Sequence, residues 1–261
     1  KFGVPLSLFN LKTNDDFGVL EIGMDKKGEI DNLSKIIKPD VGVITNISYA
    51  HIKNFKNINQ IASAKGEIIQ NIKRDGYLVL NKDDNFFNFH KNMGSKRNLK
   101  ILSFSLKNKK ASINLISINK IKSKYKVNVN VHKKKKYFYI NSIFENDLKN
   151  LLAVISVISI FIDIDKLDKN IFFNHQKITG RGDIIKIKLF KKSINLVDES
   201  YNSNPLSLKS ALKNFDMINV ASSKKHLILG DMLELGKYSK ILHAEVGKNI
   251  NRLSLKNVNV I

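Results

Sequence analysis

The sequence of 261 residues contains no cysteine, and this absence excludes disulfide bonds, thiolate metal sites and cysteine nucleophiles. It also has no apolar run long enough to cross a membrane. The longest uncharged run, Leu151–Ile162, has about half of the roughly 20 residues that a membrane span needs, so we expect a buried helix there and no membrane insertion. No signal peptide is visible, and the chain begins with Lys1 rather than methionine. We therefore expect a piece of a longer protein.

Arginine is scarce too, although the formal net charge is +22 and suggests a nucleic-acid-binding protein. Only four of the 45 basic residues are arginine, and recognition of bases and phosphates depends largely on the bidentate arginine fork. The lysines are spread among many asparagines and isoleucines. A general compositional bias explains this better than a dedicated polyanion surface, so we expect no nucleic-acid partner. A basic polyanion-binding module stays open as the alternative. The one dense run, Lys133–Lys136, is expected at a hairpin tip.

Strand and helix patterns alternate over the first third of the chain. A helix between two strands returns the chain to the same edge of a sheet, so this alternation predicts an α/β fold with a mostly parallel sheet flanked by helices. The predicted strands are Phe17–Ile22, Val41–Ile47 and Tyr77–Asn81, and the predicted helices are Gly28–Ile37, Asn59–Ile72 and Asn85–Asn92.

The pattern changes between Lys100 and Ile143, where apolar and polar residues alternate. The segments ILSFS, ASINLISI, KYKVNVNV and KYFYINSI are expected to form an antiparallel meander added to the parallel core. Two helices are predicted to follow, at Leu148–Ile162 and Lys166–Phe173.

A turn with glycine on both sides of Arg181 marks the predicted domain boundary. We expect a first domain over residues 1–179 and a second, partial Rossmann-like domain over residues 180–261. The second again alternates β and α: a hairpin, a helix, a strand, a helix and a last strand. Their predicted ranges are Ile184–Leu189, Ile194–Asp198, Pro205–Phe215, His226–Gly230, Tyr238–Ile250 and Val258–Ile261.

Three side chains that can bind metal or phosphate lie at or after the ends of the first predicted strands. Glu21 closes one strand, His51 follows the next, and Lys65 lies on the helix after it. Ligands of open parallel sheets bind beyond the carboxyl ends of the strands, so the three predict a phosphate and metal site. Taken singly, Glu21 could bond backbone amides, His51 could be a packing residue, and Lys65 could be solvated. If Lys65 turns toward the other two, burial would lower its pKa and permit a neutral, chemically modified amine.

Polar clusters recur later in the chain. Asp198 ends a predicted strand and is followed by a polar loop with Tyr201 and Asn202, while Asn204 is a plausible helix cap. Gly230–Gly236 (GDMLELG) follows another strand, with His243 on the next helix. The amides from Asn146 to Asn150 could pair with a nucleotide base.

Many short motifs occur in a fixed order along the chain: Glu21-Ile22-Gly23, Gly28-Glu29-Ile30, Pro39, Thr45-Asn46-Ile47, Ala50-His51, Ala64-Lys65-Gly66-Glu67, Gly180-Arg181, Asp198, Tyr201-Asn202-Ser203-Asn204-Pro205, Gly230-Asp231-Met232, Glu234-Leu235-Gly236 and His243. Together they resemble the Mur ligases across nearly the whole chain, apart from the meander. The fold that this resemblance implies is a P-loop-type ATP-binding central domain followed by a ligase domain.

The resemblance also implies an activity, namely ATP-dependent amide bond formation in peptidoglycan precursor synthesis through an acyl phosphate. YNSNP and GDMLELG favour the branch whose substrates are UDP-N-acetylmuramoyl-tripeptide and D-alanyl-D-alanine, and the Asp-Asn-Pro-Arg motif of the diamino-acid adder is not present. The implied cofactors are ATP and Mg²⁺, and the implied protein is a cytoplasmic monomer.

The roles that the resemblance implies fall on two groups of residues. Glu21 and His51 resemble the magnesium ligands, and Lys65 resembles the lysine that some members carry as a carbamate. On the nucleotide side, the matching residues are Asn150 at the adenine, Arg181 at the hinge, Asp198 at the ribose, and Tyr201 and Asn202 beside the nucleotide. Asp231 and Glu234 are expected to shape the C-terminal side of the cleft.

The chain departs from the family pattern in several places, and we expect the N-terminal domain that binds the UDP-sugar and the end of the C-terminal domain to be absent from it. No G-x-x-x-x-G-K-[ST] phosphate loop occurs in it, and Phe144-Glu145-Asn146-Asp147 replaces the usual Gly-x-His-Asn run. We therefore expect this chain alone to be inactive, as part of a longer or split ligase. Other Mur ligases, a folylpolyglutamate-synthase-like ligase and a non-catalytic basic relic remain as alternatives.

Overall fold

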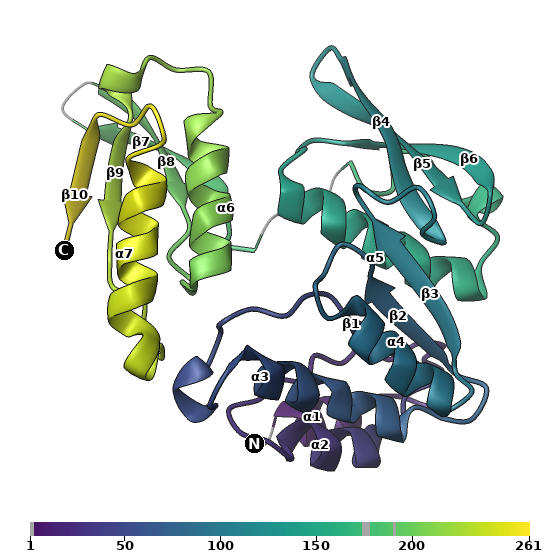
Figure 1. The fold of residues 1–261 in the computed structure, drawn as a ribbon. Helices are drawn as coiled ribbons and strands as arrows, with labels where there is room; N and C mark the ends of the chain where they lie inside the picture. The colour runs from purple at the N-terminus through teal and green to yellow at the C-terminus, as the bar shows by residue number, and fades with distance from the viewer. Residues whose placement is uncertain (1–2, 174–177, 190–191) are drawn as a thin grey trace.

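A six-stranded sheet organises the first two thirds of the chain. The structure, a computed structural model, describes residues 3–173, 178–189 and 192–261 (Figure 1). The strand order is β1-β2-β3-β4-β5-β6; the first four are parallel neighbours, and β5 and β6 continue the sheet in antiparallel pairing. The predicted α/β class with a mostly parallel sheet and an added meander is confirmed. The strands are β1 (Val41–Ile44), β2 (Tyr77–Asn81), β3 (Lys100–Ser105), β4 (Ile113–Ile121), β5 (Lys124–Val131) and β6 (Lys134–Ile140).

Helices connect and cover these strands, and we call residues 3–173 the sheet unit. Its α-helices are α1 (Gly3–Phe9), α2 (Glu29–Ile37), α3 (Ile58–Lys65), α4 (Phe87–Lys96) and α5 (Glu145–Phe161), with 3-10 helices η1 (Ile52–Asn54), η2 (Gly66–Asn71) and η3 (Ile164–Lys166). The start of α2 is fixed by Glu67, whose carboxylate accepts hydrogen bonds from the backbone N–H groups of Gly28 and Asp31. Gly28 has φ +90°, which glycine adopts without strain. These contacts join α2 to η2.

The prediction of a strand at Phe17–Ile22 is wrong. The segment is extended but pairs with no strand among the described residues, and β1 lies at the edge of the sheet instead. Phe17 is 58% exposed and Val19 is 95% exposed, so the apolar run is not covered. Apolar residues alone do not make a strand. Its backbone N–H and C=O groups must also pair with a neighbouring strand, and without one they remain hydrogen-bonded to water.

Two further expectations need correction. ILSFS does not belong to the meander: it forms β3, which pairs with β2 in parallel because α4 returns the chain to the same sheet edge. Lys166–Phe173 is not a helix but a set of turns after η3. The Asp168 carboxylate accepts a hydrogen bond from the backbone N–H of Asn170, a local bond that competes with helical pairing.

The uncharged run at 151–162 lies mostly within α5, which packs on the sheet as the buried helix that we predicted. Its residues Leu152 and Ile155 are at most 1% exposed and share a core cluster with Phe104, Val127 and Phe138 from three strands. No helix in the described part of the chain is both long and apolar enough for a membrane span.

The C-terminal unit, residues 178–261, again alternates strands and helices. A hairpin of β7 (Asp183–Leu189) and β8 (Lys192–Asp198) precedes α6 (Pro205–Asp216), the 3-10 helix η4 (Ser222–Lys224), β9 (His226–Leu229), the 3-10 helix η5 (Gly236–Tyr238), α7 (Ser239–Ile250) and β10 (Asn257–Val260). The strands β9 and β10 are parallel, which requires the crossover that α7 provides.

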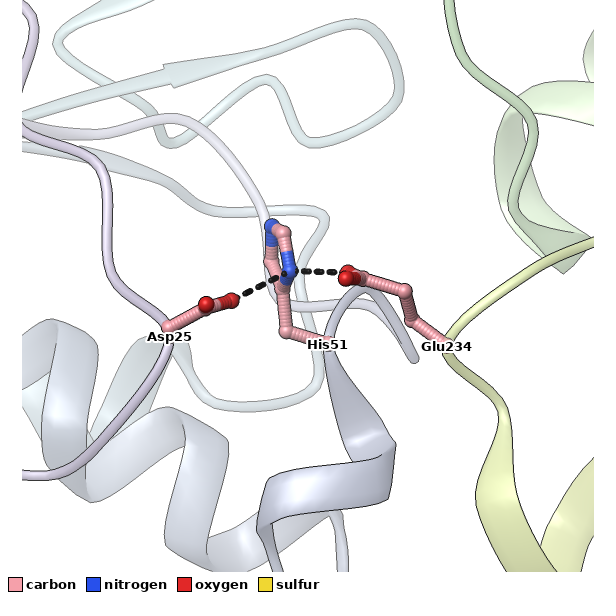
Figure 2. A group of neighbouring side chains, drawn as sticks. All are labelled: Asp25, His51 and Glu234. Atoms are coloured by element: carbon pink, nitrogen blue, oxygen red, sulfur yellow. Dashed lines mark ion pairs between the residues drawn. The ribbon is translucent and has the colours of Figure 1, made fainter.

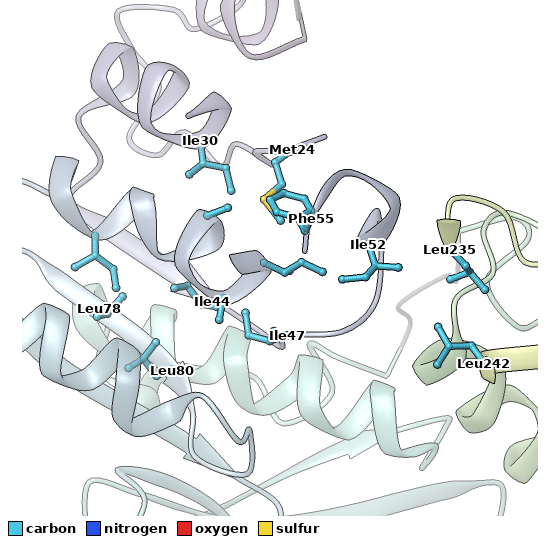
Figure 3. Close-up of a cluster of buried hydrophobic side chains, with 14 of the residues drawn as sticks. Met24, Ile30, Ile44, Ile47, Ile52, Phe55, Leu78, Leu80, Leu235 and Leu242 are labelled. Carbon is cyan, nitrogen blue, oxygen red and sulfur yellow. The ribbon is translucent and has the colours of Figure 1, made fainter. Parts of the chain in front are cut away.

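One apolar cluster runs across the two units. It contains Ile44, Ile47 and Ile52 from the sheet unit together with Leu235 and Leu242 from the C-terminal unit, as Figure 3 shows. Ile52 is 1% exposed and Leu235 is 2% exposed. The units are therefore in direct contact around the segment that carries His51.

Candidate functional site

His51 follows β1 on a loop that is fixed at both ends. The backbone N–H of Ile47 donates a hydrogen bond to Asp84 Oδ2 over 2.8 Å, and Asn81 Nδ2 donates to the Thr45 carbonyl over 3.1 Å. Both partners lie at the end of β2, the neighbouring parallel strand. His51 itself has φ +59°, and the next residue, Ile52, is buried. The loop thus holds the imidazole at the carboxyl end of the sheet, as the sequence predicted.

A loop of the C-terminal unit docks on this segment. The backbone N–H of Lys53 donates to the Glu234 carbonyl, and the Tyr238 hydroxyl donates to the Lys56 carbonyl over 2.5 Å. Gly236 has φ +53°, and a Cβ added there would lie 3.0 Å from the Cα of Lys53. The close approach and the left-handed backbone both require glycine.

Two carboxylates flank His51, as Figure 2 shows: Asp25 from the sheet unit itself and Glu234 from the docked loop. The Nδ1 of His51 lies 3.1 Å from Asp25 Oδ1 and is also paired with Glu234 Oε2. One ligand atom from each of the three residues lies within 4.8 Å of the others, and no ion is part of the structure. The hydrogen bond from Lys53 Nζ holds the pKa of the Glu234 carboxyl below its ordinary value, so this group is ionised at neutral pH.

Lys65 lies at the last position of α3 and points under the same loop. Its Nζ donates to the Asn46 carbonyl over 3.3 Å, and the side chain is only partly exposed. Burial lowers the pKa of this amine, while the charges of Asp84 and Glu21 oppose the shift. A lowered pKa is what carbamate formation requires, because only the neutral amine is nucleophilic.

Glu21 lies on the exposed extended segment rather than at a strand end. Its charge acts on Lys65, so these two predicted residues are neighbours electrostatically. Glu21 is not in the group of three around His51, where Asp25 stands instead.

The predicted nucleotide-side residues form a second cluster at the start of the C-terminal unit. The Arg181 guanidinium lies over the Tyr201 ring, 4.4 Å from its centroid, and the Tyr201 backbone N–H donates to the Gly180 carbonyl. Gly182 N donates to the Asp198 carbonyl across the first pair of the hairpin. Hydrogen bonds from Ser200 hold the Asp198 pKa below its ordinary value. Arg181, Asp198 and Tyr201 are thus brought together.

The remaining predicted residues have simpler surroundings. Asn150 is exposed on α5, and Asn202 is exposed in the loop before α6. Asn204 caps α6, as expected, with its Oδ1 accepting from Leu206 N and Ser207 N. Asp231 pairs with His243 Nε2 over 2.6 Å, a contact within the C-terminal unit.

A groove of about 1390 Å³ lies in the C-terminal unit between β8, α6 and β9. Its lining includes Asp198 and Asp231 but neither His51 nor Lys65. The groove is mainly apolar, whereas Asp25, His51, Lys53 and Glu234 meet where the two units are in contact.

Sequence reasoning missed Asp25, Lys53 and Asp84. Asp84 carried a usable signal, because it follows a parallel strand as His51 does. Asp25 and Lys53 carried none, since each gains its partner, Glu234 or His51, only through the fold.

Comparison of the sequence with protein-family models identifies the family of the chain. The family model described as Mur ligase middle domain matches residues 1–158, which is more than half of the chain. The chain belongs to the Mur ligase family. The resemblance inferred from the ordered motifs is therefore confirmed.

Relatives in this family cover nearly all of the chain. UDP-N-acetylmuramoyl-tripeptide--D-alanyl-D-alanine ligase from Buchnera aphidicola subsp. Baizongia pistaciae is 30% identical over 98% of the chain and 54% of that protein. The protein of the same name from Bacillus subtilis is 29% identical over 95% of the chain and 52% of its own length. The chain thus spans about half the length of these relatives.

Solved structures agree on the fold. MurF from Acinetobacter baumannii superposes with a TM-score of 0.87 at 24% identity, over 98% of this chain and 54% of that one. MurF ligase from Thermotoga maritima in complex with ADP gives a TM-score of 0.82 at 24% identity, over 100% and 57%.

Proposed function

We propose that the protein is an ATP-dependent amide ligase of peptidoglycan precursor synthesis, which adds D-alanyl-D-alanine to UDP-N-acetylmuramoyl-tripeptide. The observation that carries the proposal is the match to relatives of that name over nearly all of the chain. The site geometry supports it, because an imidazole and two carboxylates gather where the units meet, and a half-buried lysine bonds the loop that leads to His51. We further propose that it acts as a monomer in the cytoplasm.

We also propose that the two units are separate domains, with residues 1–179 as the central ATP-binding domain and 180–261 as part of the C-terminal ligase domain. The turn at Gly180–Asp183 suits such a boundary, because Gly180 and Gly182 both have positive φ and set the direction of the chain there. Lys53 and Glu234 then lie on facing domains.

Within this proposal, Glu21, His51 and a carbamate on Lys65 hold magnesium beside the nucleotide phosphates. The fit rests on Lys65, because burial lowers the pKa of its amine and the charge of Glu21 acts on it, whereas His51 Nδ1 faces Asp25 and Glu234. When bound, magnesium neutralises phosphate charge. On the nucleotide side we place Asn150, Arg181, Asp198, Tyr201 and Asn202, of which Arg181 and Tyr201 are already stacked.

The proposal is tested with a chimaera that joins this chain to the part of the Bacillus subtilis relative that it does not span. Product formation from UDP-N-acetylmuramoyl-tripeptide, ATP and D-alanyl-D-alanine is measured by mass spectrometry. We expect ATP-dependent product from the chimaera and none from the chain alone. Parallel reactions with a diamino acid or L-glutamate as the amine distinguish the other ligases of the family.

A second measurement keeps the test informative if the chimaera is inactive. Mg-ADP should raise the melting temperature of the chimaera, and the Asp198→Ala variant should lose this shift. A folded chimaera that gains no stability from Mg-ADP and makes no product, beside an active parent enzyme, would refute the proposed function.

One observation favours a different class. Residues 85–144 contain 14 lysines and one arginine but no acidic residue. A basic relic that binds polyanions would exploit this segment, and its binding to RNA would weaken steeply with salt. However, three of these lysines already lie over aromatic rings. The ammonium groups of Lys100, Lys124 and Lys126 lie 5.1, 3.6 and 4.1 Å from the ring centroids of Tyr77, Tyr139 and Tyr137, respectively. Filter binding to RNA at moderate salt decides between the two.

A further inference from the structure

We propose that Asp84 is a positioning residue, whose carboxylate holds the segment that follows β1 and thereby fixes His51 at the carboxyl end of the sheet. Asp84 lies after β2, and its side chain accepts a hydrogen bond from the backbone N–H of Ile47, in the segment that leads from β1 to His51. The hold on His51 is a property of the fold, whereas its use in ligation rests on the proposed function.

The backbone after β1 needs partners outside the sheet. The ladder between β1 and β2 ends at the pair Ile44 and Leu80, but the chain beyond it does not emerge into solvent, because Ile47 and Ser48 are each only 8% exposed. Backbone N–H and C=O groups that leave a ladder inside a protein must find other partners. For Ile47 that partner is the carboxylate of Asp84.

Three consecutive residues of this segment are each held by a different side chain. The Thr45 carbonyl accepts from Asn81 Nδ2 over 3.1 Å, the Asn46 carbonyl accepts from Lys65 Nζ over 3.3 Å, and the Ile47 N–H donates to Asp84 Oδ2 over 2.8 Å. The last bond is the shortest and the nearest to His51 along the chain. Its acceptor is a carboxylate, and hydrogen bonds to charged acceptors are the stronger kind.

The side chain of Asp84 is itself fixed. Its Oδ1 accepts from the backbone N–H of Phe86 over 2.8 Å, a local turn that is typical of aspartate, and this leaves Oδ2 for Ile47. A side chain that a local bond already orders needs little further ordering to hold a second group. On the other side of His51, Ile52 is 1% exposed in the apolar core. His51 therefore lies between two anchored residues.

The neighbouring carboxylate provides a matched control. Asp83 accepts from the Ser105 hydroxyl over 2.5 Å and from the Leu106 backbone N–H over 2.7 Å, both at the end of β3. Since β2 lies between β1 and β3 in the sheet, the two adjacent acids hold opposite neighbours of β2. A change at Asp83 removes the same kind of contact without touching the segment that carries His51.

The hold is tested on the 261-residue chain by nuclear magnetic resonance. Asp84→Asn has the same shape, but once its carbonyl serves Phe86, its NH₂ group faces the Ile47 N–H as a second donor. We expect about tenfold faster hydrogen exchange at the Ile47 amide. We also expect a shifted or broadened signal of the His51 imidazole, which is assigned by its loss in His51→Gln.

Asp83→Asn should give the opposite pattern. Exchange should become faster at the Leu106 amide, while the His51 signal stays where it is in the unchanged chain. The charge of Asp84 also acts on Lys65, so the comparison is repeated in the Lys65→Met chain, where the effect of Asp84→Asn on His51 should persist.

A second variant separates the hold on Ile47 from the local turn. Asp84→Ser keeps a hydroxyl that can bond the Phe86 N–H but is too short to reach Ile47, so it should reproduce the effects of Asp84→Asn. An unchanged His51 signal in these variants, or an equal change in Asp83→Asn, would overturn the proposal. Unfolding of both Asp84 variants beside a folded Asp83→Asn chain would also overturn it, because Asp84 would then have a purely structural role.

In ligation, the loss of positioning should appear as weaker use of magnesium. In the active chimaera, Asp84→Asn should raise the KM for Mg²⁺ roughly tenfold and leave the KM for D-alanyl-D-alanine unchanged, because His51 is a proposed magnesium ligand. Asp83→Asn should change neither value. An unchanged KM for Mg²⁺ in Asp84→Asn would refute the use of this hold in ligation. A chimaera that makes no product even with Asp84 in place counts against the proposed function, whereas the His51 signal of the chain alone still decides the positioning role.

Discussion

Lys53 and Glu234 are joined twice across the two units, although they are 181 residues apart. The backbone N–H of Lys53 donates to the Glu234 carbonyl over 2.9 Å, and Lys53 Nζ donates to Glu234 Oε1 over 2.7 Å. The side-chain contact is partly exposed to solvent and is expected to weaken with salt. The backbone contact depends on the path of the docked loop, which Gly236 sets.

Replacing this glycine should release the loop. Gly236→Ala introduces a Cβ 3.0 Å from the Cα of Lys53 at a residue with φ +53°, and a left-handed non-glycine residue costs about 1–2 kcal/mol before any clash is counted. We expect a lower midpoint of urea unfolding. With fluorophores attached at Ser123→Cys in the sheet unit and Asn251→Cys in the C-terminal unit, both exposed, we also expect reduced energy transfer between the units. Gly230→Ala, where an added Cβ meets nothing within 4 Å, serves as the control. Equal effects of the two changes would contradict the docking argument.

Variants of the two asparagines in the YNSNP motif should distinguish a helix cap from a residue that contacts the nucleotide. Asn204→Ala removes the side chain that accepts two backbone hydrogen bonds at the start of α6, and loss of such a cap costs about 1 kcal/mol. Asn202→Ala removes an exposed side chain and should leave stability unchanged. If Asn202 contacts nucleotide, only its variant should lose ADP affinity at full stability. Chemical unfolding and ADP titration of the active chimaera measure both effects.

His90 should make stability fall at acid pH. It is 2% exposed, and burial lowers the pKa of its imidazole below the ordinary value of 6.5, against the opposing hydrogen bond with the Ala62 carbonyl. The unfolded chain then binds the proton more readily, so this contribution is complete above pH 6.5 and is lost as the pH falls toward the lowered pKa. His90→Gln should make the urea unfolding midpoint depend less on pH over this range. His226→Gln, at an exposed site, should leave that dependence unchanged.

Lys65 should take up carbon dioxide. Its pKa is lowered by burial, so more of it is neutral at a given pH than of an exposed lysine, and the neutral amine adds to CO₂ and releases one proton to leave a carbamate anion. With ¹³C-labelled bicarbonate we expect a carbamate resonance in the nuclear magnetic resonance spectrum. It should vanish in Lys65→Met and persist in Lys91→Met, an exposed control on α4. A resonance that survives in Lys65→Met would assign the modification elsewhere.

Much of the fold was predictable because the sequence contains clear local signals. Pro39 ends α2 after Ile37, and β2 covers the predicted residues Tyr77–Asn81. The errors arose where the signal depends on neighbours. The apolar residues of 17–22 have strand character but pair with no strand in the described part of the chain, and the alternation of β3 does not reveal whether its neighbour runs parallel or antiparallel.

The candidate site was predictable only in part. His51 could be singled out because it follows a parallel strand, where ligands of this fold class bind, and Lys65 because it lies on the next helix; their roles stay predictions. Glu234 was noted only as a residue near the cleft, and Asp25 was not noted at all, because their contact with His51 joins segments that no local pattern connects.

The pairing of β4 has a mechanical consequence. Only the first two residues of β4, Ile113 and Asn114, pair with β3, whereas β4 pairs with β5 out to Ile121, so the outer part of the β4–β5 hairpin projects beyond the parallel sheet. Its tip, at Lys122 and Ser123, is exposed and contributes to no core cluster. Length changes at that tip would be tolerated without moving the strand ends that carry His51, so the hairpin is the natural place to attach a tag or a fused domain.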